Sequence, residues 1–320
     1  MLGLPIRDTY DWHMLEIRSF LLIDAIHRTG SLSGAARELG YSQPAVTQQL
    51  QQLERKLRTP LIRRIGRTSV LTEAGEVIRR HGEDVLGSVE RARIELELIA
   101  GLRTGEIRLA SFPSAAATIV PVALQQLRQD HPGLTVRLFE MNATQAMREL
   151  RKGEIDAAIV GHYFTEGDAG PKPEPDEIWR TIMDEDVYLA VHRGHAAADT
   201  DEIPMSSLAS ERWIAGCPEC RRGLLTAAAD AGFVPDIKLD TDDYIALQKL
   251  VGVGLGVCQL THLMIAAAHV DSDVVFRRVT PHRIRRVSAV IMDSSKRIPG
   301  ISELLDTIVD SAANVPLPTP

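Results

Sequence analysis

Residues able to read a nucleic acid stand close together near the start of the chain. Five polar side chains recur along one side of an expected helix: Gln43, Thr47, Gln48, Gln51 and Arg55. Glutamine can pair bidentately with adenine, threonine can bond or offer a methyl group, and arginine can reach guanine or phosphate. No acidic residue precedes Glu54 on this stretch. The pattern favours contact with DNA bases over its alternative, the solvated face of a small helical domain.

Two short helices must position that face. Ser31 is suited to cap the first helix and Gly40 to end it. Ser42 then caps the second helix, with Pro44 in its first turn. The buried side of the second helix carries apolar residues at helical spacing: Val46, Leu50, Leu53 and Leu57. A pair joined by so tight a connection projects its second helix as a recognition helix.

A basic segment follows the helix pair. Three arginines are grouped around Gly66: Arg63, Arg64 and Arg67. Branched and apolar residues come next, at Val70 and Leu71. We interpret the segment as a small β-wing whose arginines contact the DNA backbone or minor groove.

These motifs together resemble the N-terminal signature of LysR-type transcriptional regulators. The matching positions are Ala35, Ala36, Leu39, Ser42, Gln43, Pro44, Ala45, Val46, Thr47, Leu53, Glu54, Arg64, Leu71, Thr72, Ala74 and Gly75. Two positions depart from the family pattern, since Arg58 stands where Gly is usual and Ile62 where Phe is usual. The resemblance implies a homodimer or homotetramer on pseudo-palindromic promoter DNA, a small-molecule effector, and contact with RNA polymerase.

The residues expected to meet double-stranded DNA combine the helix caps, the polar face and the wing. They are Ser31, Ser42, Gln43, Pro44, Ala45, Thr47, Gln48, Gln51, Arg55, Arg63, Arg64 and Arg67. Charge is distributed to suit them: residues 14–80 carry a net charge of +5 within a chain whose total is −7. A basic head on an acidic body allows DNA contact while the body stays off the phosphates.

Composition places the chain among globular proteins. Its 320 residues are 44% hydrophobic and 25% charged, and three cysteines are too few for a disulfide framework. We find no run of 18 apolar residues and no signal peptide, so the expected location is the cytoplasm, with no membrane partner. Residues 1–13 lack a clear period and are expected to form a disordered extension.

A long helix is predicted over residues 73–100. Its apolar positions follow a heptad rhythm: Ala74, Ile78, Val85, Val89, Ala92, Leu96 and Ile99, with His81 at the one polar place. We interpret this seam as a dimerising linker helix. The alternative is a helix packed on its own domain.

After a hinge at residues 101–105, the pattern alternates strands and helices. Strands at 106–111, 134–140 and 156–161, with helices at 114–130 and 144–152 between them, predict a parallel sheet covered on both faces. The whole fold is then α/β, with an N-terminal all-α winged helix-turn-helix, a long linker helix and two Rossmann-like lobes that resemble a periplasmic-binding-protein type effector domain. The expected divisions are 14–72, 73–100, 105–161 with 269–314, 162–268, and a tail at 315–320.

A cleft between two such lobes is a natural small-ligand site, at strand ends and helix starts. The candidate effector-binding residues are Ser111, Pro113, Ser114, Ala115, Asn142, Thr144, Gly161, Cys217 and Arg221. Arg221 or its neighbour Arg222 could pair with a carboxylate, or each could be an ordinary surface residue. Thr144 could equally be a helix cap.

The cysteines at Cys217 and Cys220 form a C-x-x-C pair. Structural zinc sites usually have four protein ligands, and the sequence contains no second C-x-x-C motif to supply the other two. We therefore predict no metal site. A redox switch by disulfide closure stays open, as does a plain tight turn. We find no nucleophile elbow or phosphate loop, and therefore expect no cofactor and no catalytic residues. The alternatives are a thiol-sensing regulator, or a small-molecule-binding α/β protein that does not bind DNA.

Overall fold

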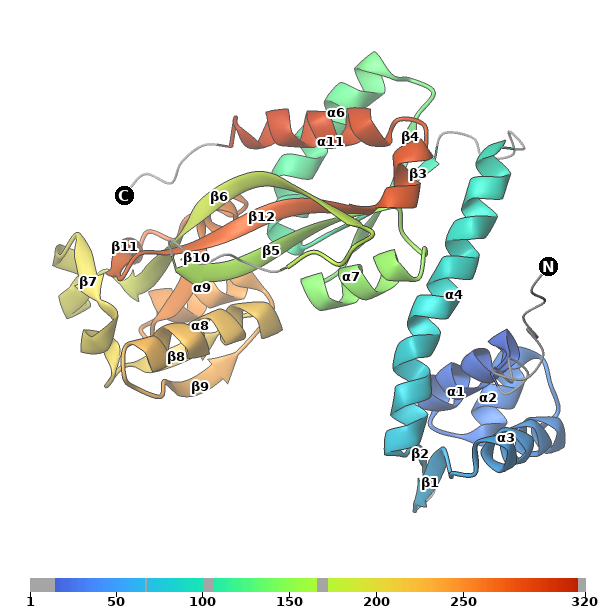
Figure 1. Cartoon of the computed structure of the whole chain (residues 1–320). Helices are drawn as coiled ribbons and strands as arrows, with labels where there is room; N and C mark the ends of the chain where they lie inside the picture. Colours follow the sequence, from blue (N-terminus) through green and yellow to red (C-terminus); the bar gives the residue numbers. More distant parts are fainter. Residues whose placement is uncertain (1–14, 67, 100–105, 166–171, 316–320) are drawn as a thin grey trace, which may run out of the picture. The chain divides into compact units, whose positions relative to one another are not determined.

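The computed structural model describes residues 15–66, 68–99, 106–165 and 172–315 (Figure 1). It divides into two compact units, one made of the chain up to Leu96 with the short segment Arg151–Gly153, and the other of the remaining residues. The expectations for residues 1–13, Arg67, the hinge at 101–105 and the tail beyond 315 lie outside the described residues. None of the helices within the described ranges has the length and apolar character needed to cross a membrane.

The first unit begins with three helices and a two-stranded wing. In chain order these are α1 (Ile17–Thr29), α2 (Leu32–Leu39), α3 (Gln43–Leu57), β1 (Ile62–Ile65) and β2 (Thr68–Leu71). One apolar cluster joins them, with Ile23, Ala35 and Val46 each fully buried. The cluster takes one stripe from each helix, so the opposite side of α3 stays exposed.

The long helix α4 spans Glu73–Ile99. Thr72 starts it, since its hydroxyl accepts a hydrogen bond from the Gly75 N–H at 3.2 Å. Gly75 is required there, because a Cβ would lie 2.2 Å from the Leu61 carbonyl oxygen. The apolar positions expected to form one seam along α4 fall into a buried group at its start and an exposed group further along.

Ala74 and Ile78 pack into the core of their own unit, as the alternative interpretation required. The later apolar positions are exposed: Val85, Val89, Ala92 and Leu96. The side chain of Ile99 lies outside the described residues.

The second unit is built on a mixed sheet whose strands run in the order β4-β3-β5-β12-β6-β11-β7. Its strands are β3 (Glu106–Ser111), β4 (Thr135–Glu140), β5 (Ala157–Thr165), β6 (Glu177–His192), β7 (Glu202–Pro204), β10 (Cys258–Thr261), β11 (Val274–Thr280) and β12 (Arg283–Met292). A separate parallel pair is formed by β8 (Arg212–Ala215) and β9 (Asp236–Asp240). The helices are α5 (Pro113–Ala117), α6 (Ile119–Asp130), α7 (Ala143–Arg151), α8 (Pro218–Asp230), α9 (Tyr244–Gly252), α10 (His262–Ala266) and α11 (Ile301–Ala312).

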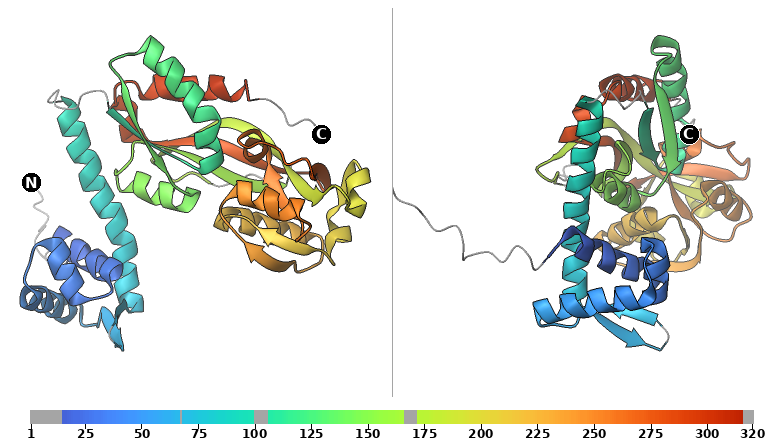
Figure 2. Two further views of the ribbon diagram at one scale, coloured as in Figure 1. Left: turned by 180° about the vertical axis from the view of Figure 1, so that it is seen from behind. Right: turned by 90° about the vertical axis from the view of Figure 1, so that its right-hand side faces the viewer.

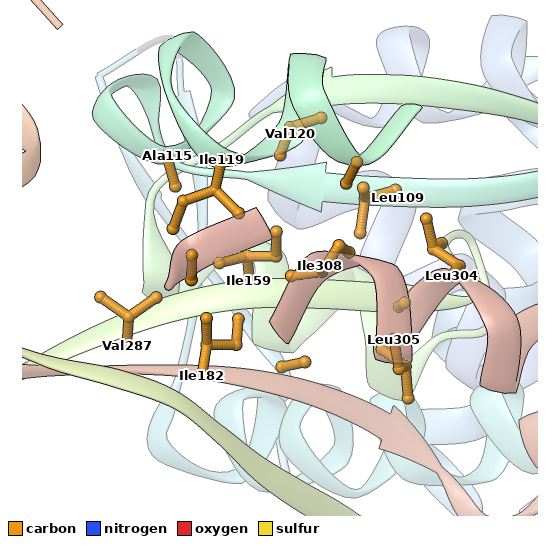
Figure 3. Close-up of a cluster of buried hydrophobic side chains, with 14 of the residues drawn as sticks. Leu109, Ala115, Ile119, Val120, Ile159, Ile182, Val287, Leu304, Leu305 and Ile308 are labelled. Atoms are coloured by element: carbon orange, nitrogen blue, oxygen red, sulfur yellow. The ribbon is translucent and has the colours of Figure 1, made fainter. Parts of the chain in front are cut away.

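Alternating side chains cover the two faces of the sheet. Leu109 and Ile159 point to the face covered by α6 and α11, which lie side by side in Figures 1 and 2. Figure 3 shows this cluster, with Ile308 among the sheet residues. Ala110 and Val160, the next residues along the same strands, instead pack against α7 on the opposite face. The period of two explains why both faces are apolar.

Strand pairing defines two lobes. Lobe I contains β3, β4, β5, β12 and the first half of β6, while lobe II contains the second half of β6 with β10, β11, β7, β8 and β9. By pairing, the chain therefore passes between lobes within β6, near Asp186, and again between β11 and β12. The crossings expected at 161–162 and 261–268 differ from this pairing.

The predicted parallel pairing is confirmed for β3 with β4 and β5, and β12 then joins the sheet antiparallel to both β5 and β6. One further expectation is corrected. The helix predicted at 114–130 is broken at Thr118 into α5 and α6.

Candidate functional site

Helix caps set the start of α3 as the sequence predicted. Ser31 Oγ accepts a hydrogen bond from the Gly34 N–H at 3.0 Å, and Gly40 ends α2 in the left-handed region with φ 69°. Ser42 Oγ then accepts from the Ala45 N–H at 3.4 Å. These bonds satisfy backbone groups that a helix end leaves open, so the turn between α2 and α3 is fixed locally.

The outward side of α3 is polar and accessible. Its exposed residues are Gln43, Pro44, Gln48, Gln51 and Arg55, while Ala45 and Thr47 are half-buried. The Thr47 hydroxyl donates to the Gln43 carbonyl at 2.9 Å, which leaves its methyl group for other contacts. Val46 and Leu50 on the opposite side are buried.

Glu54 has a structural task at the end of this helix. One of its carboxylate oxygens accepts the Leu61 N–H at 2.8 Å, which ties α3 to the chain that leads into the wing. The bond gives this charge a partner within the protein.

The wing presents its arginines to solvent. Strands β1 and β2 pair antiparallel, with Arg64 opposite Ser69, and Gly66 turns the chain with φ 62°. Arg63 and Arg64 are exposed, whereas Arg67 lies outside the described residues. Arg58, the departure from the family pattern, ends α3 with φ 54°, the left-handed conformation that glycine normally supplies.

A pocket of about 200 Å³ lies between the two lobes of the second unit. Lobe I contributes residues after β3 and β4, on β5 and on β12, and lobe II contributes the start of α8 and the turn before α9. The lining comprises Phe112, Pro113, Glu140, Met141, Asn142, Ala143, Gln145, Gly161, Tyr163, Cys217, Pro218, Glu219, Asp242 and Arg285. The volume is below that of sites for drug-sized molecules, which indicates a small ligand.

Four of the candidate effector residues line this pocket: Pro113, Asn142, Gly161 and Cys217. Asn142 also caps α7, since its Oδ1 accepts the Gln145 N–H at 2.9 Å. A Cβ at Gly161 would lie 2.9 Å from Cδ of Arg285, so glycine makes room for that arginine.

The other candidates do not line the pocket. Ser111, Ser114 and Ala115 are buried behind it. Thr144 lies beside it and donates to Glu219 Oε1 at 3.2 Å, across the two lobes. Arg221 is corrected: it is an exposed residue paired with Asp240 at 3.2 Å, because its position on α8 turns it away from the pocket. Its neighbour Arg222 lies 3.6 Å from Glu219.

Arg285 is the main residue that the sequence did not reveal. Cross-strand register sets it beside Tyr163 on β5 and Glu185 on β6. Its Nε donates to Glu185 Oε1 at 2.5 Å and its Nη2 donates to Ser114 Oγ at 3.2 Å. The guanidinium also stacks over the Phe112 ring, 4.5 Å from the centroid.

Burial and charge compete in this network. Burial alone would lower the pKa of Arg285, but the Glu185 charge and hydrogen bond raise it overall. Burial raises the pKa of the Tyr163 hydroxyl, and the Arg285 charge opposes that effect only in part. Arg285 therefore stays cationic, Tyr163 stays neutral, and the arginine's charge is matched by a buried carboxylate.

Some missed lining residues carried a usable signal. Glu140 ends a strand and Asp242 just precedes a helix, the same places that suggested Ser111 and Asn142. Tyr163 and Arg285 lie within strands, and only pairing between distant segments brings them to the pocket.

Cys217 and Cys220 are joined by a disulfide at the start of α8. The Tyr163 hydroxyl donates to the Cys220 sulfur at 3.4 Å. The third cysteine, Cys258, is buried, which raises the pKa of its thiol to about 12 and makes it unreactive. Among the described residues, no group of three or more His, Cys, Asp or Glu is arranged to hold a metal.

A winged helix-turn-helix followed by an α/β domain with an interlobe pocket defines a DNA-binding protein with a small-molecule domain. The family described as "Bacterial regulatory helix-turn-helix protein, lysR family" matches residues 17–76, and "LysR substrate binding domain" matches residues 100–313. The chain belongs to the LysR family of transcriptional regulators.

Known relatives agree with this assignment. The "Probable HTH-type transcriptional regulator LrrA" of Synechococcus elongatus is 26% identical over 94% of this chain and 99% of its own. A full-length OxyR variant from Pseudomonas aeruginosa has a TM-score of 0.57 at 19% identity, over 94% of this chain and 95% of its own. Full-length CbnR in complex with its target DNA has a TM-score of 0.53 at 23% identity, over 94% of this chain and 100% of its own. The protein is thus a LysR-type DNA-binding transcriptional regulator with an effector-binding domain, in a family of regulators rather than enzymes.

Proposed function

We propose that this regulator binds pseudo-palindromic promoter DNA as a homo-oligomer, in the cytoplasm, with α3 in the major groove. The observation that carries the proposal is the exposed polar side of α3, where the side chains of Gln48, Gln51 and Arg55 make no hydrogen bond or ion pair with any described residue. The neighbouring Glu54 carboxylate is engaged by the Leu61 N–H. Arg63 and Arg64 on the wing, with Arg67 after them in the sequence, would contact phosphates or the minor groove. Pseudo-symmetric half-sites follow from a symmetric protein.

The exposed part of α4 supports the oligomer. Val85, Val89, Ala92 and Leu96 recur at spacings of four, three and four and are exposed in the single chain. A stripe of this kind suits pairing with a second copy of the helix. A homodimer is the minimal assembly, a homotetramer its extension, and RNA polymerase a further partner on the promoter.

The pocket supports control by a small molecule. Because its lining comes from both lobes, a ligand there can bind one separation of the lobes better than another. Such differential affinity is what shifts a two-state equilibrium and with it the affinity for DNA.

The test is fluorescence anisotropy of the full chain with DNA from upstream of its own gene and with scrambled DNA, across a salt series. We expect tight binding to the first DNA only, lost in Gln48→Ala. Equal, weak binding to both DNAs would contradict base recognition at that site. Sedimentation of the Leu96→Asp variant tests the oligomer, which should dissociate while the Glu90→Asp control remains assembled.

The disulfide favours one second candidate, redox sensing. Two thiols at Cys217 and Cys220 would lose two electrons and two protons to a peroxide, forming the S–S bond and two waters. DNA binding with and without hydrogen peroxide, compared between wild type and Cys217→Ser/Cys220→Ser, separates this from effector sensing. An unchanged peroxide response in the variant would rule it out.

A further inference from the structure

The charges around the interlobe pocket do not suit the carboxylate effector that Arg221 and Arg222 suggested. Each arginine near the pocket already has a carboxylate partner: Arg221 has Asp240, Arg222 has Glu219, and Arg285 has Glu185. The cation expected to receive an anionic ligand is therefore neutralised by the protein itself. An added anion would have to compete with these partners.

Two acidic residues of the lining lack such compensation. Glu140 ends β4 in lobe I and Asp242 precedes α9 in lobe II, and both line the pocket. Neither carboxylate has an ion-pair or hydrogen-bond partner among the residues that the structure describes. The two lobes thus present like charges to the same space.

The charge of Glu140 also influences Tyr244, the first residue of α9. Burial raises the pKa of this tyrosine, and the negative charges of Asp243 and Glu140 raise it further. Glu140 of lobe I therefore acts on the first residue of α9 in lobe II. Asp243 is itself engaged as the cap of α9, accepting the Ile245 N–H at 2.8 Å.

The other charges near the pocket do not make its net charge positive. Helices α5, α7 and α8 start at the pocket, and each helix N-terminus carries up to about half a positive charge. The start of α9 is matched by its own cap, Asp243. His162 is held neutral, because burial first and Arg222 second lower its pKa. Two carboxylates against three half charges leave the pocket negative.

We propose that the effector carries an ammonium group, which Glu140 and Asp242 bind between the lobes. The proposal rests on the proposed function, since it names the ligand class of the same pocket. A cation there would also relieve repulsion between the lobes and favour their closer arrangement, which gives the ligand a differential affinity for one state. The small volume restricts it to a compact amine.

The experiment compares three probes on the same four-carbon chain by isothermal titration of the full-length protein: 1,4-diaminobutane, 4-aminobutanoate and butanedioate. We expect the two amine-bearing probes to bind the wild type at least about tenfold more tightly than butanedioate, as hydrogen bonds between charged groups allow. Their binding should weaken by about tenfold or more in Glu140→Gln/Asp242→Asn. It should stay unchanged in the control Glu154→Gln/Glu202→Gln, which removes two exposed acids outside the pocket.

Three outcomes overturn the proposal: tighter binding of butanedioate than of diaminobutane, equal affinity in wild type and double variant, or no binding of any probe at millimolar concentration. DNA binding of each sample is measured in parallel. If butanedioate binds and changes DNA affinity, the charge assignment fails while the regulator function stands. If diaminobutane binds and DNA affinity is unchanged, the charge assignment stands and coupling to DNA fails.

Discussion

The exposed polar side of α3 and the interlobe pocket are built in opposite ways. The α3 face comes from residues within one helix, fixed by caps such as the Ser42 to Ala45 bond that span three positions. The pocket depends on pairs such as Arg285 with Ser114, which are 171 residues apart. The polar side chains of the first region point away from the core and do not support it, whereas those of the second region are part of the core of their unit. The consequence is that substitutions on α3 should change binding, while substitutions in the pocket network should also change stability.

The largest effect is expected from Arg285→Met. This change leaves the buried charge of Glu185 without its cationic partner, with only the Leu263 N–H bonded to it, which costs about 3–5 kcal/mol of unfolding free energy. The measurement is urea unfolding followed by tryptophan fluorescence, with Trp179 and Trp213 both in the second unit. The matched control is Arg286→Met, the next residue on β12, whose exposed pair with Asp184 contributes only about 0–1 kcal/mol.

A double variant keeps this result interpretable. Arg285→Met/Glu185→Leu removes both charges and should recover much of the lost stability. Equal losses for Arg285→Met and Arg286→Met would show that the buried pair is not what the second unit depends on.

Gln48→Ala, in contrast to Arg285→Met, should change DNA binding and leave the stability of the protein almost unchanged. The exposed side chain contributes little to folding, so stability should remain within about 0.5 kcal/mol of wild type. Discrimination of operator from scrambled DNA should fall by about 1–3 kcal/mol, measured by anisotropy. Arg64→Ala is the companion variant: it should weaken binding to both DNAs alike and reduce the salt slope by about 1. If Gln48→Ala lowered stability and left DNA affinity unchanged, Gln48 would have a role in folding and none in DNA recognition, which would contradict the prediction.

Arg58→Gly tests how local the geometry of α3 is. Arg58 has φ 54°, a conformation that costs a side-chain-bearing residue energy and glycine almost none. After the loss of chain entropy is subtracted, we expect about 0.5–1 kcal/mol of stabilisation in thermal unfolding. Gln52→Gly, within the same helix, should instead destabilise by about 1 kcal/mol. Destabilisation by both would mean that Arg58 makes a compensating contact.

The smallest effect concerns pH. Burial lowers the pKa of His162 below its usual 6.5, so the folded protein resists protonation that the unfolded chain accepts. Stability should therefore fall as the pH drops through 6.5, down to the lowered pKa of the folded state. Urea unfolding between pH 8 and pH 5 should show a shallower dependence in His162→Gln. If the free energy of unfolding depended on pH identically in wild type and His162→Gln, His162 would not be a source of the pH dependence.

The success of prediction from sequence also differed between the α3 face, which is built by local contacts, and the pocket, which is built by distant pairs. The caps at Ser31 and Ser42, the exposed polar face and the wing were predicted correctly because each depends on neighbours within a few positions. The prediction of an exposed apolar seam on α4 was correct only for the later positions, because Ile78 packs into the core of its own unit. In the pocket, the rule of strand ends and helix starts located Pro113, Asn142 and Cys217 but misplaced Arg221. It could not find Tyr163 or Arg285, whose position depends on the pairing of β5, β12 and β6.

The sequence by itself determined the polar face of α3, its caps and the parallel strands β3, β4 and β5, because hydrophobic period and capping chemistry act over a few residues. Tertiary structure decided the antiparallel return of β12, the pairing of Arg285 with Glu185 and the sign of the charge left in the pocket. Those outcomes depend on which distant side chains become neighbours. Only those neighbours show that Arg221 and Arg285 have carboxylate partners, while Glu140 and Asp242 have no cationic partner within the described part of the chain.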